Sequence, residues 1–294
     1  MSLSSFYQSS ESRSPAISFE LFPPKTEKGR ANMYDHLQRL LEFNPAYVTC
    51  TYGAGGSTRD KTLDIVKEVK QRFQIPVASH LTVVDATKQD LREYLTTARD
   101  GGVDYIVALR GDPPSGRSYF QAAKGGLRYA NELVSLIRDE FTEFGIAVAG
   151  YPEVHQEATN AQVDLDNLKR KVDAGADIVI TQLFYDNQDY FAFRDKCVAA
   201  GITVPIVPGI LPALSLKQVK KITRLCSAKL PKVFEDRLNE KPDDADWQLK
   251  VGIEHATAQV NNLVSGGVEG LHFYVLNKSA STSAILSSLQ DVAG

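Results

Sequence analysis

The sequence has few cysteines and no cysteine motif. Three cysteines occur in 294 residues, and Cys50, Cys197 and Cys226 lie far apart with no CxxC pair. This odd number at wide spacing excludes a disulfide framework and argues against a cysteine-based metal site. We therefore expect reduced, structural thiols and a cytoplasmic protein.

Long apolar runs and an excess of charge of one sign are also missing. No stretch approaches the roughly 18 apolar residues of a membrane span, and the N-terminus has no apolar core of the signal-peptide type. Lys and Arg number 33 against 36 Asp and Glu, whereas nucleic-acid-binding domains usually show a basic excess. We predict that neither a membrane nor a nucleic acid is a partner.

What remains is a globular composition, with 43% hydrophobic and 23% charged residues. It excludes disordered, collagen-like and coiled-coil proteins. The N-terminal residues MSLSSFYQSSESRS are polar and rich in serine, and we interpret residues 1–15 as a flexible arm. Residues 16–294 are expected to form a single catalytic domain, because α/β barrels of about 250 residues are routinely single domains.

Eight short apolar runs are typical of parallel strands that are buried on both faces. They span residues 16–22, 46–52, 76–83, 105–110, 146–151, 178–185, 204–211 and 270–276. Helical patterns separate them. Three helix-to-strand junctions repeat one pattern, in which glycine ends the helix in a left-handed cap before an apolar residue and an acid; they are GGVD at 101–104, AGAD at 174–177 and GGVE at 266–269.

Eight strand–helix units predict an α/β fold, a TIM (β/α)8 barrel. An open doubly wound sheet is the alternative, but the absence of an obvious edge strand favours the barrel. The segment between Leu211 and Gly270 is too long for one helix and its loops. We expect extra helices inserted there, before the last strand.

The active site of such a barrel lies at the carboxyl ends of the strands. Glu20, at the end of the first predicted strand, is a candidate catalytic residue. It lies among Phe19, Leu21 and Phe22, and burial favours the protonated form of a carboxyl group. A protonated Glu at neutral pH is a useful general acid. The alternative is a structural Glu whose charge is satisfied by a partner inside the barrel, such as an Arg or Lys.

Other polar residues suggest a binding site. Asp112, between Gly111 and two prolines, indicates a rigid loop at a strand end, or a simple turn. Asp164, Asn167 and Lys171 share one helix face, flanked by Arg170, which is either a solvated surface or a cradle for sugar and phosphates. No zinc-type spacing joins His80, Glu153 and His155, so we predict no metal site. The glycine-rich segment GAGGS at 53–57 is neither GxGxxG nor a Walker loop.

Eight motifs in order resemble the bacterial methylenetetrahydrofolate reductase family, over residues 16 to 290. They are SFELFPPK (18–25), TYGA (51–54), HLT (80–82), LRGD (109–112), YPEVH (151–155), NLKRK (167–171), TQLF (181–184) and HFY (272–274). Any one of these motifs alone would be weak, but together they are specific.

The resemblance implies a TIM barrel that holds FAD and reduces 5,10-methylenetetrahydrofolate to 5-methyltetrahydrofolate, in one-carbon metabolism and methionine supply. Glu20 would be the general acid that protonates the leaving folate nitrogen, and Asp112 would lie near the flavin ring and the pterin. Thr51 and Gln182 would contact folate or the nicotinamide. The implied flavin contacts are Tyr52, Ala54, His80, Arg110, Gly111, Asp112, Tyr129, Ala130, Tyr151, His155, Ala158, Asp164, Asn167, Arg170 and Lys171.

The same resemblance implies ping-pong hydride transfer from NADH or NADPH, with NADH favoured, and a homo-oligomer. Eukaryotic members add a C-terminal domain that binds S-adenosylmethionine, and we expect that regulation to be absent. At two positions the sequence departs from the pattern of some bacterial members, and both residues are expected near the substrate. Leu216 is aligned with a Phe after strand seven, and Lys278 with an Arg after strand eight. Lys keeps the charge but loses the bidentate fork.

Three alternatives stay open on the sequence. They are a flavin-free reductase of the same kind, a related flavin barrel such as proline dehydrogenase, and a non-enzymatic barrel that binds folate or flavin. A buried acid at Glu20 argues against pure binding.

Overall fold

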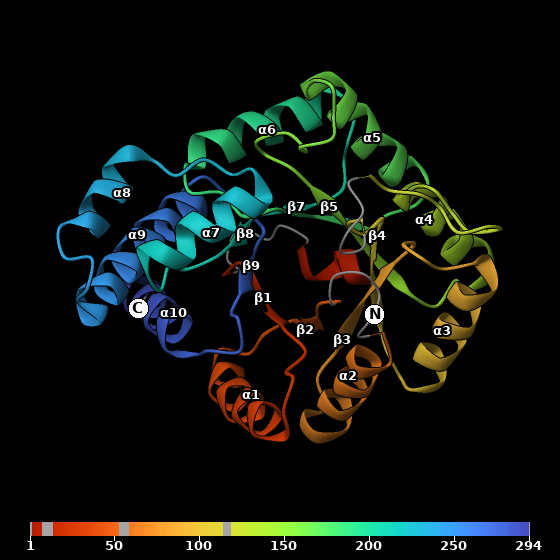
Figure 1. The fold of residues 1–294 in the computed structure, drawn as a ribbon, viewed down its shortest axis with the longest axis horizontal. Helices are drawn as coiled ribbons and strands as arrows, with labels where there is room; N and C mark the ends of the chain where they lie inside the picture. The colour runs from red at the N-terminus through yellow and green to blue at the C-terminus, as the bar shows by residue number, and fades with distance from the viewer. Residues whose placement is uncertain (1, 8–13, 53–58, 114–118, 294) are drawn as a thin grey trace.

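The computed structural model describes residues 2–7, 14–52, 59–113 and 119–293 (Figure 1). Short parallel strands surround a central axis, and helices form an outer ring around them. The strands are β1 (Ala16–Leu21), β2 (Tyr47–Cys50), β3 (Val77–Thr82), β4 (Tyr105–Leu109), β5 (Gly145–Gly150), β6 (Ile178–Thr181), β7 (Ile206–Val207), β8 (Gly209–Ile210) and β9 (Gly270–Tyr274). Their order, β7-β6-β5-β4-β3-β2-β1-β9-β8, is a nearly closed barrel, which confirms the predicted TIM fold.

The seventh predicted strand, 204–211, is wrong as one continuous strand. It is divided at Pro208 into β7, which pairs with β6, and β8, which pairs with β9. Proline has no N–H to donate to a ladder. The Pro208 carbonyl still accepts from the His272 N–H at 3.0 Å, so the chain changes neighbours there and closes the ring.

The helices of the outer ring alternate with the strands. They are α1 (Glu27–Leu40), α2 (Arg59–Phe73), α3 (Lys88–Asp100), α4 (Ala130–Glu140), α5 (Ala161–Asp173), α6 (Asn187–Ala199) and α10 (Ala280–Ala293). Outward side chains such as Phe19, Leu21 and Val48 pack against them in the main core. The strands are therefore buried on both faces, as their continuous apolar sequences predict.

Three further helices lie between β8 and β9, where the sequence predicts an insertion. They are α7 (Leu216–Cys226), α8 (Lys232–Asn239) and α9 (Ala245–Ser265). Phe234 and Leu238 of α8 and Val251 of α9 join Leu211 and Val219 in a separate small core. In the part of the chain that the structure describes, no helix combines the length and the apolar character needed to cross a bilayer.

The repeated helix-to-strand junctions have the predicted geometry. The second residue of each pattern has a positive φ: 77° at Gly102, 114° at Gly175 and 75° at Gly267. In two of the three junctions, at Asp104 and Asp177, the carboxylate of the acid accepts a hydrogen bond from a backbone N–H at the start of the neighbouring strand. The Asp177 carboxylate accepts from the Ile146 N–H at 2.6 Å and pairs with Arg138 at 2.7 Å. These junctions therefore fix where the strands begin.

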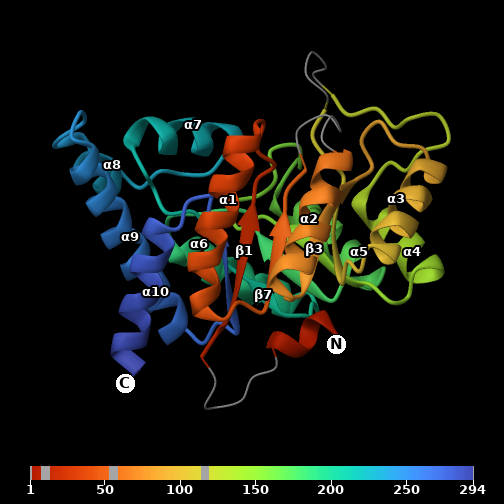
Figure 2. The same cartoon turned by 90° about the horizontal axis from the view of Figure 1, so that it is seen from below.

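The flexible-arm interpretation is wrong for Leu3–Tyr7, a short 3-10 helix at the amino-terminal end of the barrel (Figure 2). Leu3 and Tyr7 are buried against Tyr47 and Tyr105, the first residues of β2 and β4. A Cβ on Gly270 would lie 2.3 Å from the Tyr7 ring, so only glycine leaves room for it. Two apolar side chains in a serine-rich segment thus close the floor of the barrel, because the barrel end offers them an apolar surface.

Candidate active site

Two connected cavities open at the carboxyl ends of the strands. The central cavity, about 450 Å³, lies inside the barrel mouth, and the outer cavity, about 750 Å³, extends from it between α4 and α5. The residues that line both are Leu109, Arg110, Ala149, Tyr151 and His155. The site is thus a single two-lobed space that bends over the ends of β4 and β5.

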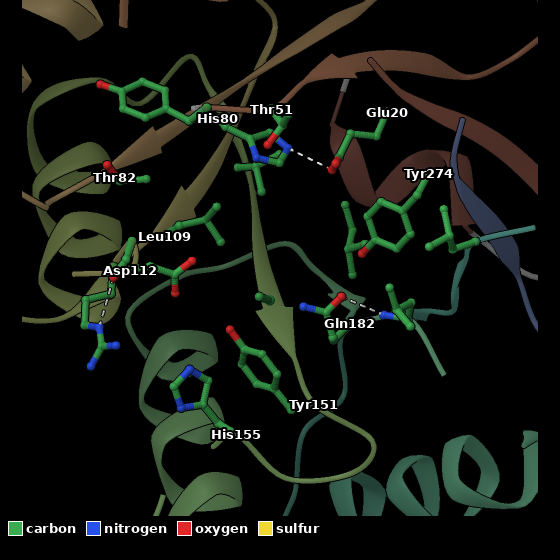
Figure 3. Close-up of a pocket in the computed structure, with 18 of the residues that line it drawn as sticks. Glu20, Thr51, His80, Thr82, Leu109, Asp112, Tyr151, His155, Gln182 and Tyr274 are labelled. Carbon is green, nitrogen blue, oxygen red and sulfur yellow. Dashed lines mark hydrogen bonds and ion pairs between the residues drawn. The ribbon is translucent and has the colours of Figure 1, made fainter. Parts of the chain in front are cut away.

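The structure brings nearly all of the predicted site residues into these two lobes. The central cavity is lined by Glu20, Thr51, Tyr52, His80, Arg110, Gly111, Asp112, Tyr151, His155 and Gln182 (Figure 3). The outer cavity is lined by Arg110, Tyr129, Ala130, Tyr151, His155, Ala158, Asp164, Asn167, Arg170 and Lys171. Ala54 lies outside the described residues.

Two predicted substrate residues lie elsewhere. Leu216 is the first residue of α7 and packs in the small core with α8 and α9. Among the described residues that line the central cavity, α7 contributes Ile222, which the sequence reasoning missed. Lys278 lines a small neighbouring cavity that shares Tyr274 and Leu276 with the central one, so it lies beside the mouth rather than in it.

Glu20 lies on β1 and points into the barrel, where two histidines meet it. Its Oε2 is 3.2 Å from the His80 Nε2 and 3.6 Å from the His272 Nε2. Burial alone would raise the pKa of Glu20, but the two histidines outweigh burial and lower the pKa to about 2. The expectation that an isolated buried carboxyl stays protonated is therefore wrong for this protein without ligands. The partners are histidines, rather than the Arg or Lys considered from the sequence.

The wall around Glu20 also carries polar atoms without partners in the protein. The Thr82 Oγ1 and the His80 Nδ1 are buried and have no hydrogen-bond partner among the described residues. Buried polar groups without a partner are costly. Both residues belong to the lining of the central cavity.

On the opposite side of the cavity, Gln182 follows β6. Its Oε1 accepts from the Leu183 N–H at 2.9 Å, which leaves the amide NH2 available toward the cavity (Figure 3). Tyr274, at the end of β9, donates its hydroxyl to the Thr181 carbonyl at 2.7 Å. The side chain of Tyr274 therefore forms a fixed edge of the mouth, another lining residue to which the sequence reasoning gave no role.

The loop after β4 brings Asp112 to the cavity through a glycine. Gly111 has a φ of 87°, and a Cβ there would lie 2.9 Å from the Val84 side chain. Glycine is the residue that adopts this backbone without strain. Asp112 follows directly at the cavity edge. Desolvation raises the pKa of the half-buried Tyr151, and the charge of Asp112 raises it further.

The loop after β5 is strained where it carries two predicted site residues. Val154 has a φ of 72°, which is a true outlier for a β-branched residue. The Tyr151 and His155 rings meet edge to face at 4.6 Å, and the His155 N–H donates to the Asp164 carboxylate at 3.0 Å. Strain of this kind persists where the surroundings fix it and is common at binding sites.

The outer cavity has a cationic rim. Arg110 forms a bidentate pair with Glu157 at 2.7 Å, and Arg170 donates to the Asn167 side chain at 2.7 Å. The Lys171 ammonium donates to the Ala149 carbonyl, and burial lowers the pKa of Lys171 to about 8. The polar face of α5 therefore lines the outer cavity, where Asn167 and Arg170 remain exposed and Asp164 and Lys171 are half-buried. Cations in such a position suit a phosphate-bearing ligand.

A metal-binding arrangement of His80, Glu153 and His155 was a weak alternative from the sequence. Glu153 instead accepts from the Lys229 N–H at 2.6 Å, away from the other two. Within the ranges that the structure describes, no group of three or more His, Cys, Asp or Glu side chains could hold a metal ion.

Residues 5–290 match the sequence profile of the family described as methylenetetrahydrofolate reductase. The chain is 44% identical over 276 residues to the 5,10-methylenetetrahydrofolate reductase of Escherichia coli K12, covering 93% of this chain and 90% of the relative. It is 38% identical to methylenetetrahydrofolate reductase (NADH) 1 of Arabidopsis thaliana, covering 93% of this chain and 48% of that longer protein. An uncharacterized Clostridium thermocellum protein that binds two copies of 5-methyl-5,6,7,8-tetrahydrofolic acid shares the fold, with a TM-score of 0.63 at 16% identity over 96% of each chain.

Proposed function

Because this chain belongs to the methylenetetrahydrofolate reductase family, we propose that it reduces 5,10-methylenetetrahydrofolate to 5-methyltetrahydrofolate. The proposal includes FAD as cofactor and NADH or NADPH as electron donor, in a ping-pong sequence. The observation that carries it is the two-lobed cavity, in which an acid–histidine cluster on one side meets a phosphate-binding wall on the other.

The residues present fit FAD. A flat ring system suits the central lobe, where the Thr82 hydroxyl and the His80 Nδ1 lack partners. The cationic outer lobe suits a ribose and a pyrophosphate, with Arg170 and Lys171 as charge partners and Asn167 as a hydrogen-bonding side chain. The chemistry that FAD supplies when bound is hydride transfer from the reduced nicotinamide to the methylene carbon of the folate.

The protein's own part is to place the reactants and to supply a proton. Thr51 and Gln182 lie on opposite sides of the central cavity, where they can contact the nicotinamide or the folate, which would occupy this space in turn. Glu20 would protonate the folate nitrogen that leaves as the five-membered ring opens. Asp112, at the rim, would orient the pterin, since a fixed carboxylate can accept hydrogen bonds from its N–H groups.

The identity of the proton donor needs a step that the sequence did not suggest. In the protein without ligands, Glu20 is a carboxylate paired with histidines. A ligand that fills the central cavity excludes water from the Glu20 carboxylate, and loss of hydration disfavours the charged form of a carboxyl group. Substrate binding would therefore favour the protonated form of Glu20 and make the acid available when the cavity is filled.

The oligomeric state, the cellular location, the metabolic role and the preferred nicotinamide are inferred from the family and its relatives, not from the site. We propose a homo-oligomer that works in the cytoplasm and supplies methyl groups for methionine. NADH is favoured over NADPH because the name of the Arabidopsis relative specifies NADH. Light scattering tests the oligomeric state, and steady-state kinetics with NADH and with NADPH test the preferred electron donor.

The decisive experiment separates the two half-reactions. Purified protein is loaded with FAD, and its flavin absorbance is followed without oxygen. We expect NADH to bleach the flavin and methylenetetrahydrofolate to restore the absorbance. Protein that fails to take up FAD would support a flavin-free variant, whereas uptake without turnover would support a binding protein. Oxidation of proline would support the proline dehydrogenase alternative.

A further inference from the structure

The two lobes of the site meet at a waist, which we define as the lining residues that both lobes share. They are Leu109, Arg110, Ala149, Tyr151 and His155. These residues come from the ends of β4 and β5 and from the two loops that follow these strands. A ligand that fills both lobes passes through the waist, so the fit around it depends on how the two loops are held together.

The ladder between β4 and β5 stops short of these two loops. Its last paired residues are Ala108 and Val148. Beyond them, in the part of the chain that the structure describes, the hydrogen bonds between the two loops are those of Arg110 with Glu157. The two terminal nitrogens of the guanidinium each donate to one oxygen of the Glu157 carboxylate, at 2.7 Å. This pair therefore fastens the loops together at the waist.

Arg110 is also held on its remaining sides. Its Nε donates to the Gly111 carbonyl at 3.3 Å, and its guanidinium lies over the Phe120 ring, 5.1 Å from the ring centroid. An arginine side chain has many rotamers, and ordering them when a ligand binds costs free energy. Because these contacts already select one conformation, Arg110 loses less entropy when a ligand binds.

Glu157 is itself held in place by the loop after β5. Its N–H donates to the His155 Nδ1 at 3.1 Å, and the His155 N–H donates to the Asp164 carboxylate of α5. Burial, followed by the Arg110 charge, lowers the pKa of His155, so a neutral imidazole accepts the first of these bonds. The strained Val154 lies next to them, and such strain persists only where the surroundings fix it. The Glu157 carboxylate is thus part of a fixed loop rather than a freely moving counter-ion.

Two other cations of the outer lobe donate to neutral groups instead. Arg170 donates to the Asn167 side chain, and Lys171 donates to the Ala149 carbonyl. These two cations keep an uncompensated charge for a phosphate, whereas the charge of Arg110 is compensated by a carboxylate. The difference indicates that Arg110 serves to place a ligand at the waist more than to attract its phosphates.

We propose that Glu157 is a positioning residue of the cofactor site. By fixing Arg110, it ties the loops after β4 and β5 together and keeps the waist in the shape that holds FAD. The inference rests on the proposed function, because FAD is the ligand that would pass through the waist. Glu157 was not among the residues predicted from the sequence, and it acts through Arg110 rather than on the reacting atoms.

The first test measures how fast FAD leaves the protein. Glu157→Gln removes the bidentate partner of Arg110, and we expect the rate constant of FAD dissociation, followed by flavin fluorescence, to rise by about tenfold. Glu140→Gln is the matched control, because Glu140 forms the same bidentate pair with Arg92 at 2.7 Å, outside the described lining of both cavities. Exposed ion pairs contribute little to stability, so both variants should unfold at nearly the wild-type temperature.

A second variant separates the position of Glu157 from its charge. Glu157→Asp keeps the carboxylate but shortens the side chain by one methylene, so the bidentate pair cannot form at the same spacing of the loops. FAD should dissociate from this variant about threefold faster than from wild type, or more. Wild-type behaviour of Glu157→Asp would show that charge alone matters and would overturn the proposal. This variant also covers the case in which Glu157→Gln does not fold.

A third measurement uses the protein without FAD. Amide hydrogen exchange in residues 151–159, followed by mass spectrometry, should be faster in Glu157→Gln than in wild type or Glu140→Gln, because the loop has lost its fastening. Unchanged exchange would contradict the proposal. So would a Glu157→Gln variant that releases FAD at the wild-type rate, or one that binds FAD more tightly, as expected if Glu157 competed with the cofactor for Arg110. A wild type that takes up no FAD would instead refute the proposed cofactor, and the exchange measurement would still test the fastening.

Discussion

The two walls of the barrel interior have opposite chemistry. From β9 through β1 to β3 the inward side chains are mainly polar, and Ala78 is an apolar exception. The polar ones include His272, Tyr274, Ser18, Glu20, Thr49, His80 and Thr82. From β4 to β7 they are mainly apolar, and Tyr105 at the start of β4 carries a hydroxyl. The apolar ones include Val107, Leu109, Ala147, Ala149, Ile178, Ile180 and Val207. Both walls come from the same kind of strand in the same sheet.

The comparison assigns the two walls different parts: the apolar wall contributes packing, and the polar wall contributes the chemical groups of the site. Small and branched side chains on the apolar wall, such as Val107, Leu109 and Ile180, line the central cavity opposite the polar wall. The polar wall holds an acid, two histidines and two hydroxyls, those of Thr49 and Thr82, that have no hydrogen-bond partner among the described residues. Such buried polar groups cost stability. A protein retains such groups where they act.

The largest effect should come from the acid of the polar wall. Glu20→Gln keeps the shape of the side chain but removes the transferable proton. We expect flavin reoxidation by methylenetetrahydrofolate to fall by about 10²- to 10⁴-fold, with flavin reduction by NADH nearly unchanged. Stopped-flow absorbance measures both. Equal losses in the two half-reactions would show that Glu20 is structural.

Adding a hydroxyl to the apolar wall and removing one from the polar wall should change the free energy of unfolding by different amounts. Val107→Thr buries a hydroxyl on the apolar wall and should lower the free energy of unfolding by about 1–3 kcal/mol. Thr82→Val removes a hydroxyl without a partner from the polar wall and should cost less than about 0.5 kcal/mol. Urea unfolding of both variants measures these two changes in the free energy of unfolding. A larger loss for Thr82→Val than for Val107→Thr would contradict the division.

Lys171 joins the apolar wall to the outer cavity, through the Ala149 carbonyl. Burial lowers the pKa of Lys171 from its ordinary 10.5 to about 8, so the folded protein binds this proton less tightly than the unfolded chain. Stability should therefore rise with pH between about 8 and 10.5 in wild type relative to Lys171→Met. Urea unfolding across this range measures the difference.

The same substitution should weaken FAD binding by about tenfold or more, since one charge-assisted hydrogen bond is lost. Calorimetry in two buffers of different ionisation enthalpy should show proton uptake on FAD binding to wild type near pH 8.5, because a phosphate raises the pKa of Lys171. Lys169→Met is the control, because Lys169 pairs with Asp173 on the helix surface. Identical FAD affinities for the two variants would exclude the role of Lys171.

The smallest effect concerns the helix above the cavity. Ile222→Ala enlarges the central cavity and should raise the KM for methylenetetrahydrofolate by several-fold, about 1 kcal/mol. Leu216→Ala should instead lower stability and leave the KM unchanged, since Leu216 packs against α8 and α9. Steady-state kinetics and thermal unfolding separate the two, and a KM effect at Leu216 would restore its predicted role.

Local patterns in the sequence predicted much of the fold, and the family resemblance supplied most of the candidate site residues that line the two cavities. Continuous apolar runs located the strands, and the three glycine junctions located the ends of helices. The assignment of Leu216 failed because helical phase decides which residue of α7 faces the cavity, and Ile222 faces it six residues later. Leu3 and Tyr7 were missed because two apolar residues in a polar segment carry no periodic signal.

The sequence by itself determined which chemical groups are present and which strand carries each. Alternation along β1 directs both Ser18 and Glu20 inward, and this follows from the period of a strand. Only the tertiary structure decided the charge of Glu20. Its partner His272 is distant in the chain and reaches it because ring closure pairs β1 with β9. Electrostatic interactions depend on distance through space, so the protonation state of the acid is set by His80 on β3 and by His272, which the folded barrel places 3.2 Å and 3.6 Å from the Glu20 Oε2.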